Sequence, residues 1–387
     1  MSTKPQARPD QVDRLFLSPP HITQAEIDAT VAALRSGWVA PLGPEVDGFE
    51  QDIIDFTDVP YAVALSSGTA ALHLGLLALG VTAGDEVIVP TLTFGATAFA
   101  VTYTGARPVF MDVDETTWNL DPGLLDQDLR ERARNGRLPA AIVPVDIFGR
   151  PCDYERILPI AEEFDVPVLE DAAEALGSRT HLGSTGSFGR AGVFSFNGNK
   201  IMTTGGGGML VSSDAALVSK VRFWSTQSRE PQPWYEHAEI GFNYRMSNVL
   251  AAIGRAQLAR LPGMIDRRME IRSRYAHQLG RLPGVRVVLD PAGSRGNGWL
   301  TNVRFDCTAH PGAPERARMA LEARNIESRP VWKPMHLQPV FADAPAVVNG
   351  TSERIFADGL CLPSGSAMSD DQVDLVCEVV AEVLRAA

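Results

Sequence analysis

The chain has 387 residues and a formal net charge of −12. This length predicts one large domain and a smaller one. The acidic balance argues against binding to nucleic-acid phosphates or to an anionic membrane surface. The four cysteines show no CxxC spacing and the seven histidines no metal-ligand pattern, so we expect no disulfide framework and no metal site.

Two segments of the sequence bear on the cellular location of the protein. The N-terminus is polar and lacks the apolar core of a signal peptide. Residues 62–81 are apolar and long enough for a membrane span, but Ser66–Thr69 and His73 interrupt them. We therefore interpret this window as a strand, a turn and a helix, and we expect a soluble, cytoplasmic protein.

The first part of the chain predicts an arm, a helix and a loop. Residues 1–20 are expected to form an extended arm. The apolar spacing predicts a helix over 21–36 with Thr23 as its N-cap. The loop 37–44 displays Trp38, and loops that display aromatic residues often bind ligands. Composition alone leaves open whether Trp38 binds a ligand or seals a domain edge.

A candidate anion site follows. The strand Tyr61–Leu65 runs into Ser66–Thr69, and a helix is predicted from Ala70 to Leu79. Free N–H groups and the helix dipole favour an anion at such a helix start, and Gly68 permits close approach of backbone. Ordinary N-caps use the same residue types, so this signal is weak alone.

Strands and helices then alternate, which predicts an α/β fold with a mostly parallel sheet covered on both faces. Ligands of such sheets bind at the carboxyl ends of the strands. Phe94 could stack on a flat heteroaromatic ring or simply pack in the core. The polar or aromatic residues at or near predicted strand ends are Ser67, Phe94, Asp171 and Ser195.

The stretch 166–211 points to a cofactor. Asp171 ends one apolar strand, and Lys200 follows the next, 193–196. Lysine is rarely buried unless it is paired or has reacted. Pyridoxal 5′-phosphate (PLP) needs a lysine that forms a Schiff base and an acid that faces its pyridine nitrogen. The alternative is a surface lysine beside an N-capping aspartate.

The remaining chain predicts a long loop over 227–244, a helix over 246–261 and another from Pro262 to Leu282. Strands and helices beyond these predict a separate α+β unit. We therefore expect a large PLP-binding domain over 21–254 and a small C-terminal domain over 255–387. The final helix begins with a capping box at Ser369–Gln372.

Several motifs together resemble the DegT/DnrJ/StrS family of PLP-dependent sugar aminotransferases. The resemblance implies an aspartate-aminotransferase-like fold (fold type I). Within the family the chain looks most like the branch that aminates UDP-linked 4-keto-6-deoxy-hexosamines for cell-surface glycans. The motifs are Ser67-Gly68-Thr69, EDAAEALGS from Glu170, FSFNGNK ending at Lys200, TTGGGG from Thr203, NYRMSN from Asn243, APLGP from Ala40 and RPVWKPMH from Arg329.

The resemblance implies a role for each matching residue. Lys200 would form the Schiff base and then move the proton, and Asp171 would pair with the pyridinium nitrogen. Phe94 would stack on the ring. Asn243 would reach the phosphate from the partner subunit, which implies a homodimer with shared sites. The phosphate-binding residues would be Ser67, Gly68, Thr69 and Ser195, and those near the nucleotide sugar Trp38, Trp332 and Lys333.

A diphosphate-bearing substrate also predicts cations at the mouth of the site. Lys333, Arg229 and Arg245 are the candidates, and each could instead be an ordinary surface charge.

Three positions depart from the family pattern. Glu174 stands where many members have Gln or His near the phenolic oxygen of PLP, so its carboxyl must be protonated or turned away. Gly206 replaces an acid. Asn197 stands where dehydratases of the family carry His, which favours transamination.

The implied reaction transfers the amino group of L-glutamate to a nucleotide-linked 4-keto sugar. The alternatives are a sugar 3-aminotransferase or dehydratase of the same fold, or a catalytically silent relative. A dinucleotide-binding oxidoreductase is disfavoured because no GxGxxG follows a strand.

Overall fold

The computed structural model describes residues 14–385, so the first thirteen residues of the expected arm lie outside the described residues. The rest of the arm lies against the C-terminal part of the chain. The amide of Leu15 donates to the carbonyl of Asn325 at 3.1 Å, and the amide of Glu327 donates to the carbonyl of Leu15 at 2.8 Å.

The central sheet joins two four-stranded ladders through parallel bridges between Ile142 and Val168 and between Val145 and Asp171. In spatial order its strands are β14 (Ala346–Val347), β3 (Arg107–Met111), β2 (Glu86–Pro90), β4 (Ala141–Ile142), β5 (Leu169–Asp171), β8 (Ala191–Ser195), β9 (Gly208–Ser212) and β1 (Tyr61–Leu65). Strand β9 pairs antiparallel with both neighbours, and the other pairings are parallel. The prediction of a mostly parallel sheet is confirmed.

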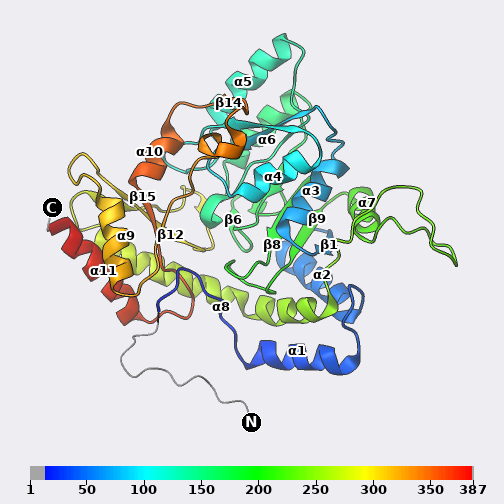
Figure 1. Ribbon diagram of the computed structural model, residues 1–387, viewed down its shortest axis with the longest axis horizontal. Helices are drawn as coiled ribbons and strands as arrows, with labels where there is room; N and C mark the ends of the chain where they lie inside the picture. The colour runs from blue at the N-terminus through cyan, green and yellow to red at the C-terminus, as the bar shows by residue number, and fades with distance from the viewer. Residues whose placement is uncertain (1–13, 386–387) are drawn as a thin grey trace.

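Both faces of this sheet are buried, as a parallel sheet requires. Val87 and Val89 of β2 belong to one apolar cluster, and Ile88 between them belongs to another. The covering helices of the first cluster are α3 (Gly68–Ala78), α4 (Gly95–Tyr103) and α7 (Ala215–Ser225), and those of the second are α5 (Pro122–Arg134) and α6 (Tyr154–Glu163). Figure 1 shows α3, α4 and α7 beside the strands.

One helix links the two parts of the molecule. Helix α8 (Asn248–Leu279) packs on α1 (Gln24–Ser36) and α2 (Pro44–Thr57) near its start and on α11 (Asp370–Arg385) near its end (Figure 1). The expected break at Pro262 is wrong, because Pro262 lies inside this helix. An internal proline costs about 3 kcal/mol, and packing against three helices offsets that cost. The expected domain boundary after residue 254 falls in the second turn of α8.

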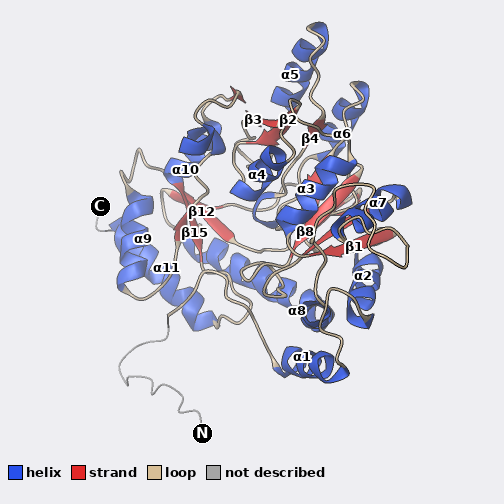
Figure 2. Ribbon diagram, turned by 45° about the vertical axis from the view of Figure 1, so that its right-hand side comes forward, coloured by secondary structure: helices blue, strands red, loops and turns tan. Residues whose placement is uncertain are grey.

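A second, antiparallel sheet forms the C-terminal part (Figure 2). Its strands in order are β10 (Val285–Val287), β12 (Thr301–Phe305), β15 (Gly359–Leu362) and β13 (Arg329–Pro330), and helices α9 (Ala313–Ala323), α10 (Thr351–Asp358) and α11 contact it. A small sheet elsewhere holds β11 (Ser294–Arg295), β6 (Arg179–Thr180) and β7 (Gly183–Ser184). The chain also returns to the large sheet through β14. Short 3-10 turns are η1 (Ile147–Gly149), η2 (Met335–Leu337) and η3 (Pro339–Phe341).

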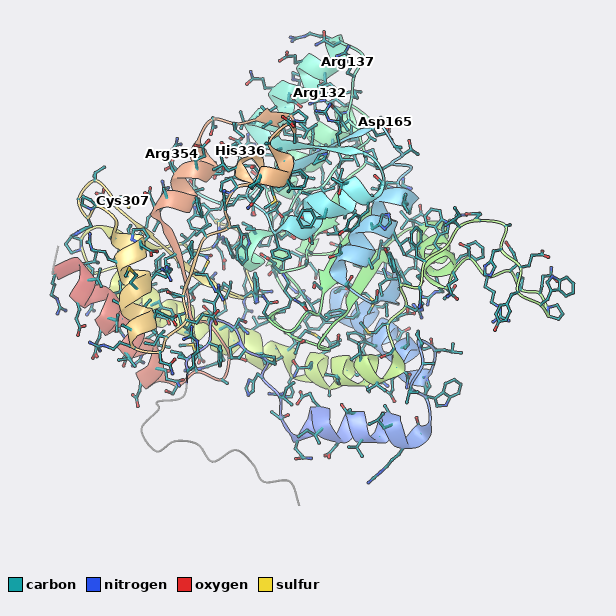
Figure 3. All side chains as sticks on the ribbon, viewed as in Figure 1. Arg132, Arg137, Asp165, Cys307, His336 and Arg354 are labelled. Carbon is teal, nitrogen blue, oxygen red and sulfur yellow. The ribbon has the colours of Figure 1, made fainter. Side chains whose placement is uncertain are left out.

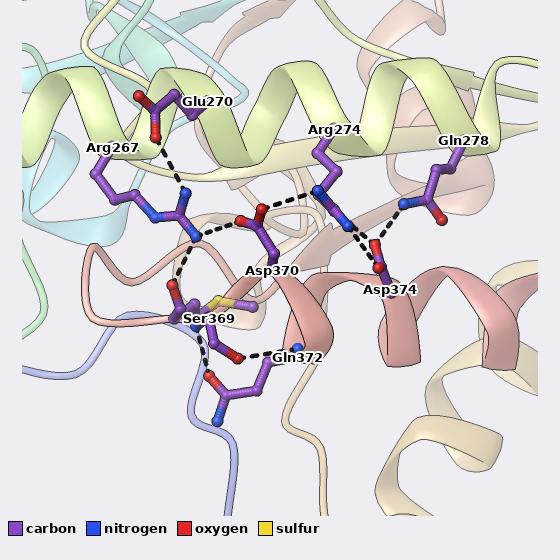
Figure 4. A network of polar contacts seen from close by, with 9 residues as sticks. Arg267, Glu270, Arg274, Gln278, Ser369, Asp370, Gln372 and Asp374 are labelled. Atoms are coloured by element: carbon purple, nitrogen blue, oxygen red, sulfur yellow. Dashed lines mark hydrogen bonds and ion pairs between the residues drawn. The ribbon is translucent and has the colours of Figure 1, made fainter.

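The start of α11 is held by the predicted capping box. The Ser369 amide donates to Gln372 Oε1 at 3.0 Å, and the Gln372 amide donates to Ser369 Oγ at 3.2 Å. Figure 4 shows this box beside Arg267 and Arg274 of α8, which bind Asp370. These contacts join α11 to the long helix.

Three further expectations concern membrane spans, disulfides and metal sites. Across residues 14–385, no helix combines the length and the apolar character that a membrane span needs. All four cysteines have free thiols. In the same residues, no group of three or more histidine, cysteine or acidic side chains is placed to hold a metal ion.

Candidate active site

A cavity of about 240 Å³ lies at the carboxyl ends of β1, β2, β5 and β8. This is the edge at which ligands of parallel sheets bind. The predicted site residues that line it are Ser67, Gly68, Thr69, Phe94, Asp171, Glu174, Ser195 and Lys200. Asn197 and Gly206, the two other departures from the family pattern, line it too.

A larger, open hollow of about 870 Å³ lies at the opposite edge of the sheet. It is lined by the start of β5, around Val168, and by the end of α3, around Ala78. Helix C-termini present carbonyl oxygens and a partial negative charge. The start of α7 and two cations also line the hollow, but the N-cap Asp214 already accepts from the Ala216 and Leu217 amides. Arg190 pairs with Asp214 and Lys220 with Glu239. Because these groups are already partnered, we place the chemistry in the smaller cavity.

Lys200 lies in the turn after β8, and its side chain is only 10% exposed. Its Nζ is 3.3 Å from Glu174 Oε1 and 4.4 Å from the ring centre of Trp299. The buried carboxyl group of Glu174 and the face of the Trp299 ring thus hold the amino group of Lys200. The alternative of a surface lysine does not describe this position.

Asp171 ends β5 and is buried. Thr97 Oγ1 donates to Asp171 Oδ2 at 2.7 Å, and the Ala173 amide donates to Oδ1 at 3.1 Å. Burial raises the pKa of Asp171, while these two hydrogen bonds and the charge of Lys200 lower it. Within the described residues, no ion pair compensates this carboxyl group, although it faces the cavity.

The start of α3 forms one end of the cavity. Ser67 is the N-cap, and its Oγ accepts from the Ala70 amide at 3.0 Å. Gly68 packs against Ser195 so closely that an added Cβ would lie 2.9 Å from Ser195 Cβ. The N–H groups of the first helical turn and the Ser195 hydroxyl therefore sit together, an arrangement that suits a phosphate.

Phe94 is 58% exposed, which argues against the alternative of ordinary core packing. Its ring centre is 6.1 Å from that of Trp332, at an angle of 61°. The segment that carries Trp332 is held to β2 through His336, whose Nδ1 is 2.6 Å from Thr91 Oγ1. Figure 3 labels His336, beside the start of the segment that leads to α10.

Glu174 is buried next to Lys200. Its Oε2 accepts from the Phe148 amide at 2.7 Å. Burial raises the pKa of Glu174, and the nearby Lys200 partly opposes that effect. The residue turns toward Lys200, and the raised pKa favours the protonated carboxyl that the sequence requires beside a phenolate.

The structure does not bring the other predicted residues into this cavity. Arg245 donates to Glu50 Oε1 at 2.8 Å and to the Ala64 carbonyl at 2.9 Å, and its side chain is 8% exposed. It therefore joins an internal ion pair and is no free cation at the mouth. Residues that are exposed and outside the cavity lining are Trp38, Arg229, Asn243 and Lys333, and Trp332 is half-buried outside it.

Sequence reasoning missed Thr93 and Thr97. Both are buried, both line the cavity, and Thr97 hydrogen-bonds Asp171. Thr93 precedes α4 and Thr97 lies in its first turn, so no spacing along the chain signalled their approach to Asp171.

The described residues fit PLP. A lysine and a buried carboxyl group without an ion-pair partner line one cavity, and the N-terminus of α3, where Gly68 packs against Ser195, forms one end of it. These are the groups that PLP requires for its carbonyl carbon, its pyridine nitrogen and its phosphate. The fold and the site define a PLP-dependent enzyme.

Comparisons with known proteins place the chain within that class. The model of the DegT/DnrJ/EryC1/StrS aminotransferase family matches residues 20–381, and the chain belongs to this family. It is 44% identical over 371 residues to "Putative pyridoxal phosphate-dependent aminotransferase EpsN" of Bacillus subtilis (strain 168), covering 95% of each chain. It is 37% identical to the GDP-perosamine synthase of Caulobacter vibrioides, covering 96% of this chain and 98% of that one.

The fold agrees with a solved structure of an aminotransferase, TlmJ from Streptoalloteichus hindustanus. The TM-score is 0.88 at 32% identity, over 96% of this chain and 98% of that one. The protein is a PLP-dependent sugar aminotransferase, and the predicted fold type, cofactor and enzyme class are confirmed.

Proposed function

We propose that the protein transfers the amino group of L-glutamate to the keto carbon of a 4-keto-6-deoxy sugar carried on a nucleoside diphosphate, with a UDP-linked hexosamine as the expected substrate. The observation that carries the proposal is the single cavity lined by Lys200, by Asp171 and by the N-terminus of α3. The membership of a sugar aminotransferase family supports it.

Each residue of the cavity has a separate role in this reaction. Bound PLP supplies an electron-withdrawing ring, which Asp171 keeps protonated by presenting a carboxylate. The start of α3 and Ser195 bind the phosphate, and Phe94 covers the ring. Lys200 Nζ moves the proton. Glu174, 3.3 Å from that nitrogen, holds the proton when the amine must be neutral.

We propose that the active unit is a homodimer in which Asn243 reaches the partner's site. Asn243 lies in the segment between α7 and α8, which projects from the molecule (Figure 1). Trp234, Tyr235 and Ile240 of this segment are 59, 78 and 87% exposed. Exposed apolar side chains on an extended segment support burial against a second copy of the chain.

Two observations bear on which nucleotide carries the sugar. One relative is named for a GDP-linked sugar, whereas the sequence motifs favour a UDP-linked one. Lys333 is exposed beside Trp332, where it could meet a diphosphate but carries no base specificity.

A substrate panel tests the proposal. The purified protein with PLP and L-glutamate is given 4-keto-6-deoxy sugars on UDP, GDP or dTDP, and 2-oxoglutarate and the amino sugar are measured. We expect equal amounts of both products, with the UDP-linked hexosamine preferred. Deoxygenated sugar together with free ammonia would indicate a dehydratase, because loss of the sugar oxygen takes two electrons that glutamate gives up as it forms 2-oxoglutarate. An amine at C3 would indicate the other regiochemistry, and no turnover at all would indicate a silent relative.

A further inference from the structure

A chain of two hydroxyl groups ends on the carboxyl group of Asp171. Thr93 Oγ1 lies 2.8 Å from Thr97 Oγ1, and Thr97 Oγ1 donates to Asp171 Oδ2 at 2.7 Å. The three residues are between 0 and 4% exposed. Thr93 lies in the turn after β2 and Thr97 in the first turn of α4, whereas Asp171 ends β5.

When Asp171 is ionised, the number of hydroxyl hydrogens fixes the direction of both hydrogen bonds. A carboxylate only accepts, so Thr97 must donate its one hydroxyl hydrogen to Asp171. Thr97 can then only accept from Thr93, whose own hydrogen is used in the 2.8 Å contact. The hydroxyl hydrogens of Thr93 and Thr97 thus each enter a short hydrogen bond.

The opposite direction is poorer. If Asp171 were protonated and donated to Thr97, then Thr97 would donate to Thr93. The remaining Thr93 hydrogen would have the Phe94 carbonyl as its acceptor, at 3.4 Å. Because this is at the long limit of a hydrogen bond, the geometry prefers the direction in which Thr97 donates to Asp171 Oδ2. A hydrogen bond donated to a carboxyl oxygen favours the ionised form of the group.

We propose that Thr93 and Thr97 are positioning residues that keep the buried Asp171 ionised and aimed at the pyridine nitrogen of PLP. The inference rests on the proposed role of Asp171 and extends it to two residues that do not touch the reacting atoms.

The surroundings explain why such support is needed. Burial is the largest influence on Asp171 and raises its pKa, and the Thr97 hydrogen bond is the first of the opposing effects. Thr97 lies in the first turn of α4, at the end of the helix that carries the partial positive charge. The other titratable groups in the cavity are Lys200, whose charge lowers the pKa of Asp171, and Glu174, whose own pKa the charge of Asp171 raises. Lys200 cannot take over the hydrogen bonds of this relay (Thr93 to Thr97 to Asp171), because its Nζ is hydrogen-bonded to Glu174.

The test compares two cofactors in a Thr97→Val variant, which keeps the shape of the side chain and removes the hydroxyl. The probes are PLP and its analogue with carbon in place of the pyridine nitrogen. We expect PLP to bind about 10- to 100-fold more weakly, the loss of a hydrogen bond to a charged group. The analogue cannot be protonated at that position, so its affinity should change less than threefold. Equal weakening of both would overturn the proposal, because it would indicate a packing role.

Further variants keep this test decisive if Thr97→Val folds poorly. Thr97→Ser keeps the donor and should retain most of the preference for PLP. Thr93→Val should weaken PLP binding less than Thr97→Val, and the double variant no more than Thr97→Val alone, since the two act in series. Additive losses would contradict the relay.

Two control variants distinguish the proposed role of the two threonines from the proposed role of Asp171. Thr57→Val removes a buried hydroxyl that donates to the Ile53 carbonyl at 2.7 Å, away from the cavity, and should leave both affinities unchanged. Asp171→Asn should abolish the preference for PLP over the analogue. If Asp171→Asn keeps that preference, the proposed role of Asp171 is wrong. If Asp171→Asn loses the preference but Thr97→Val binds both cofactors like the wild type, only the proposed role of the threonines is wrong.

Discussion

Replacing Gly68 with alanine perturbs the phosphate end of the cavity at one point. The added Cβ would lie 2.9 Å from Ser195 Cβ and 3.2 Å from its Oγ, whereas carbon atoms in contact are about 3.5–4.0 Å apart. Ser195 would therefore have to move. Gly206 lines the same cavity, and a Cβ there would meet nothing within 4 Å, so Gly206→Ala is a matched control.

The expected sizes follow from these contacts. Overpacking costs about 1–3 kcal/mol, and alanine is favoured over glycine in a helix by up to about 1 kcal/mol. We expect the free energy of unfolding of the apoprotein to fall by about 0–2 kcal/mol. Losing the Ser195 hydroxyl as a donor to a charged phosphate costs about 1.5–3 kcal/mol, which weakens PLP binding about 10- to 150-fold.

Two measurements check this prediction: urea unfolding of the apoproteins and absorbance titration with PLP. Gly68→Ala should lose far more affinity than stability, and Gly206→Ala should match the wild type in both. If Gly68→Ala binds PLP within twofold of the wild type, the phosphate does not lie at the start of α3 and the reasoning is refuted.

Three further predictions concern charged groups. Burial raises the pKa of Glu174, so its contribution to stability is fully present below its unfolded pKa of about 4.3 and is lost as pH rises through the folded value. In urea unfolding, apo Glu174→Gln should show a stability advantage over the wild type that grows as pH rises above about 4, and parallel curves would contradict this. Arg245→Met should lower the free energy of unfolding by about 2–3 kcal/mol because it leaves Glu50 with one buried partner fewer, while KM for the sugar stays unchanged; a raised KM at intact stability would instead place Arg245 in the substrate site. Lys333→Ala should raise KM for the nucleotide sugar about two- to fivefold, as for an exposed ion pair, with no change in stability, and an effect that persists in high salt would argue against an electrostatic contact.

The sequence could predict those parts of the site that depend on local pattern. Strand ends carry Asp171, Ser195 and the residues before α3 to one edge, so their convergence follows from the parallel topology alone. Lys200 was recognisable because a lysine between two interior strands is unusual. In each case, a residue and its few neighbours along the chain define the position.

The errors concern contacts between distant segments. Pro262 stays helical because packing from three other helices outweighs its local cost. Arg245 turns inward because Glu50, far away in the sequence, is buried without enough water to solvate it. Thr97 acquires its role only when α4 and β5 come together. None of these partners can be inferred from spacing.

The central claim is that Lys200 is the residue that holds PLP. Borohydride reduction of the protein with added PLP, followed by proteolysis and mass spectrometry, tests it most directly. The account predicts that the reduced cofactor is attached to the peptide that contains Lys200, and that Lys200→Ala carries no label. An unlabelled Lys200 peptide, or a label on another lysine, would contradict it.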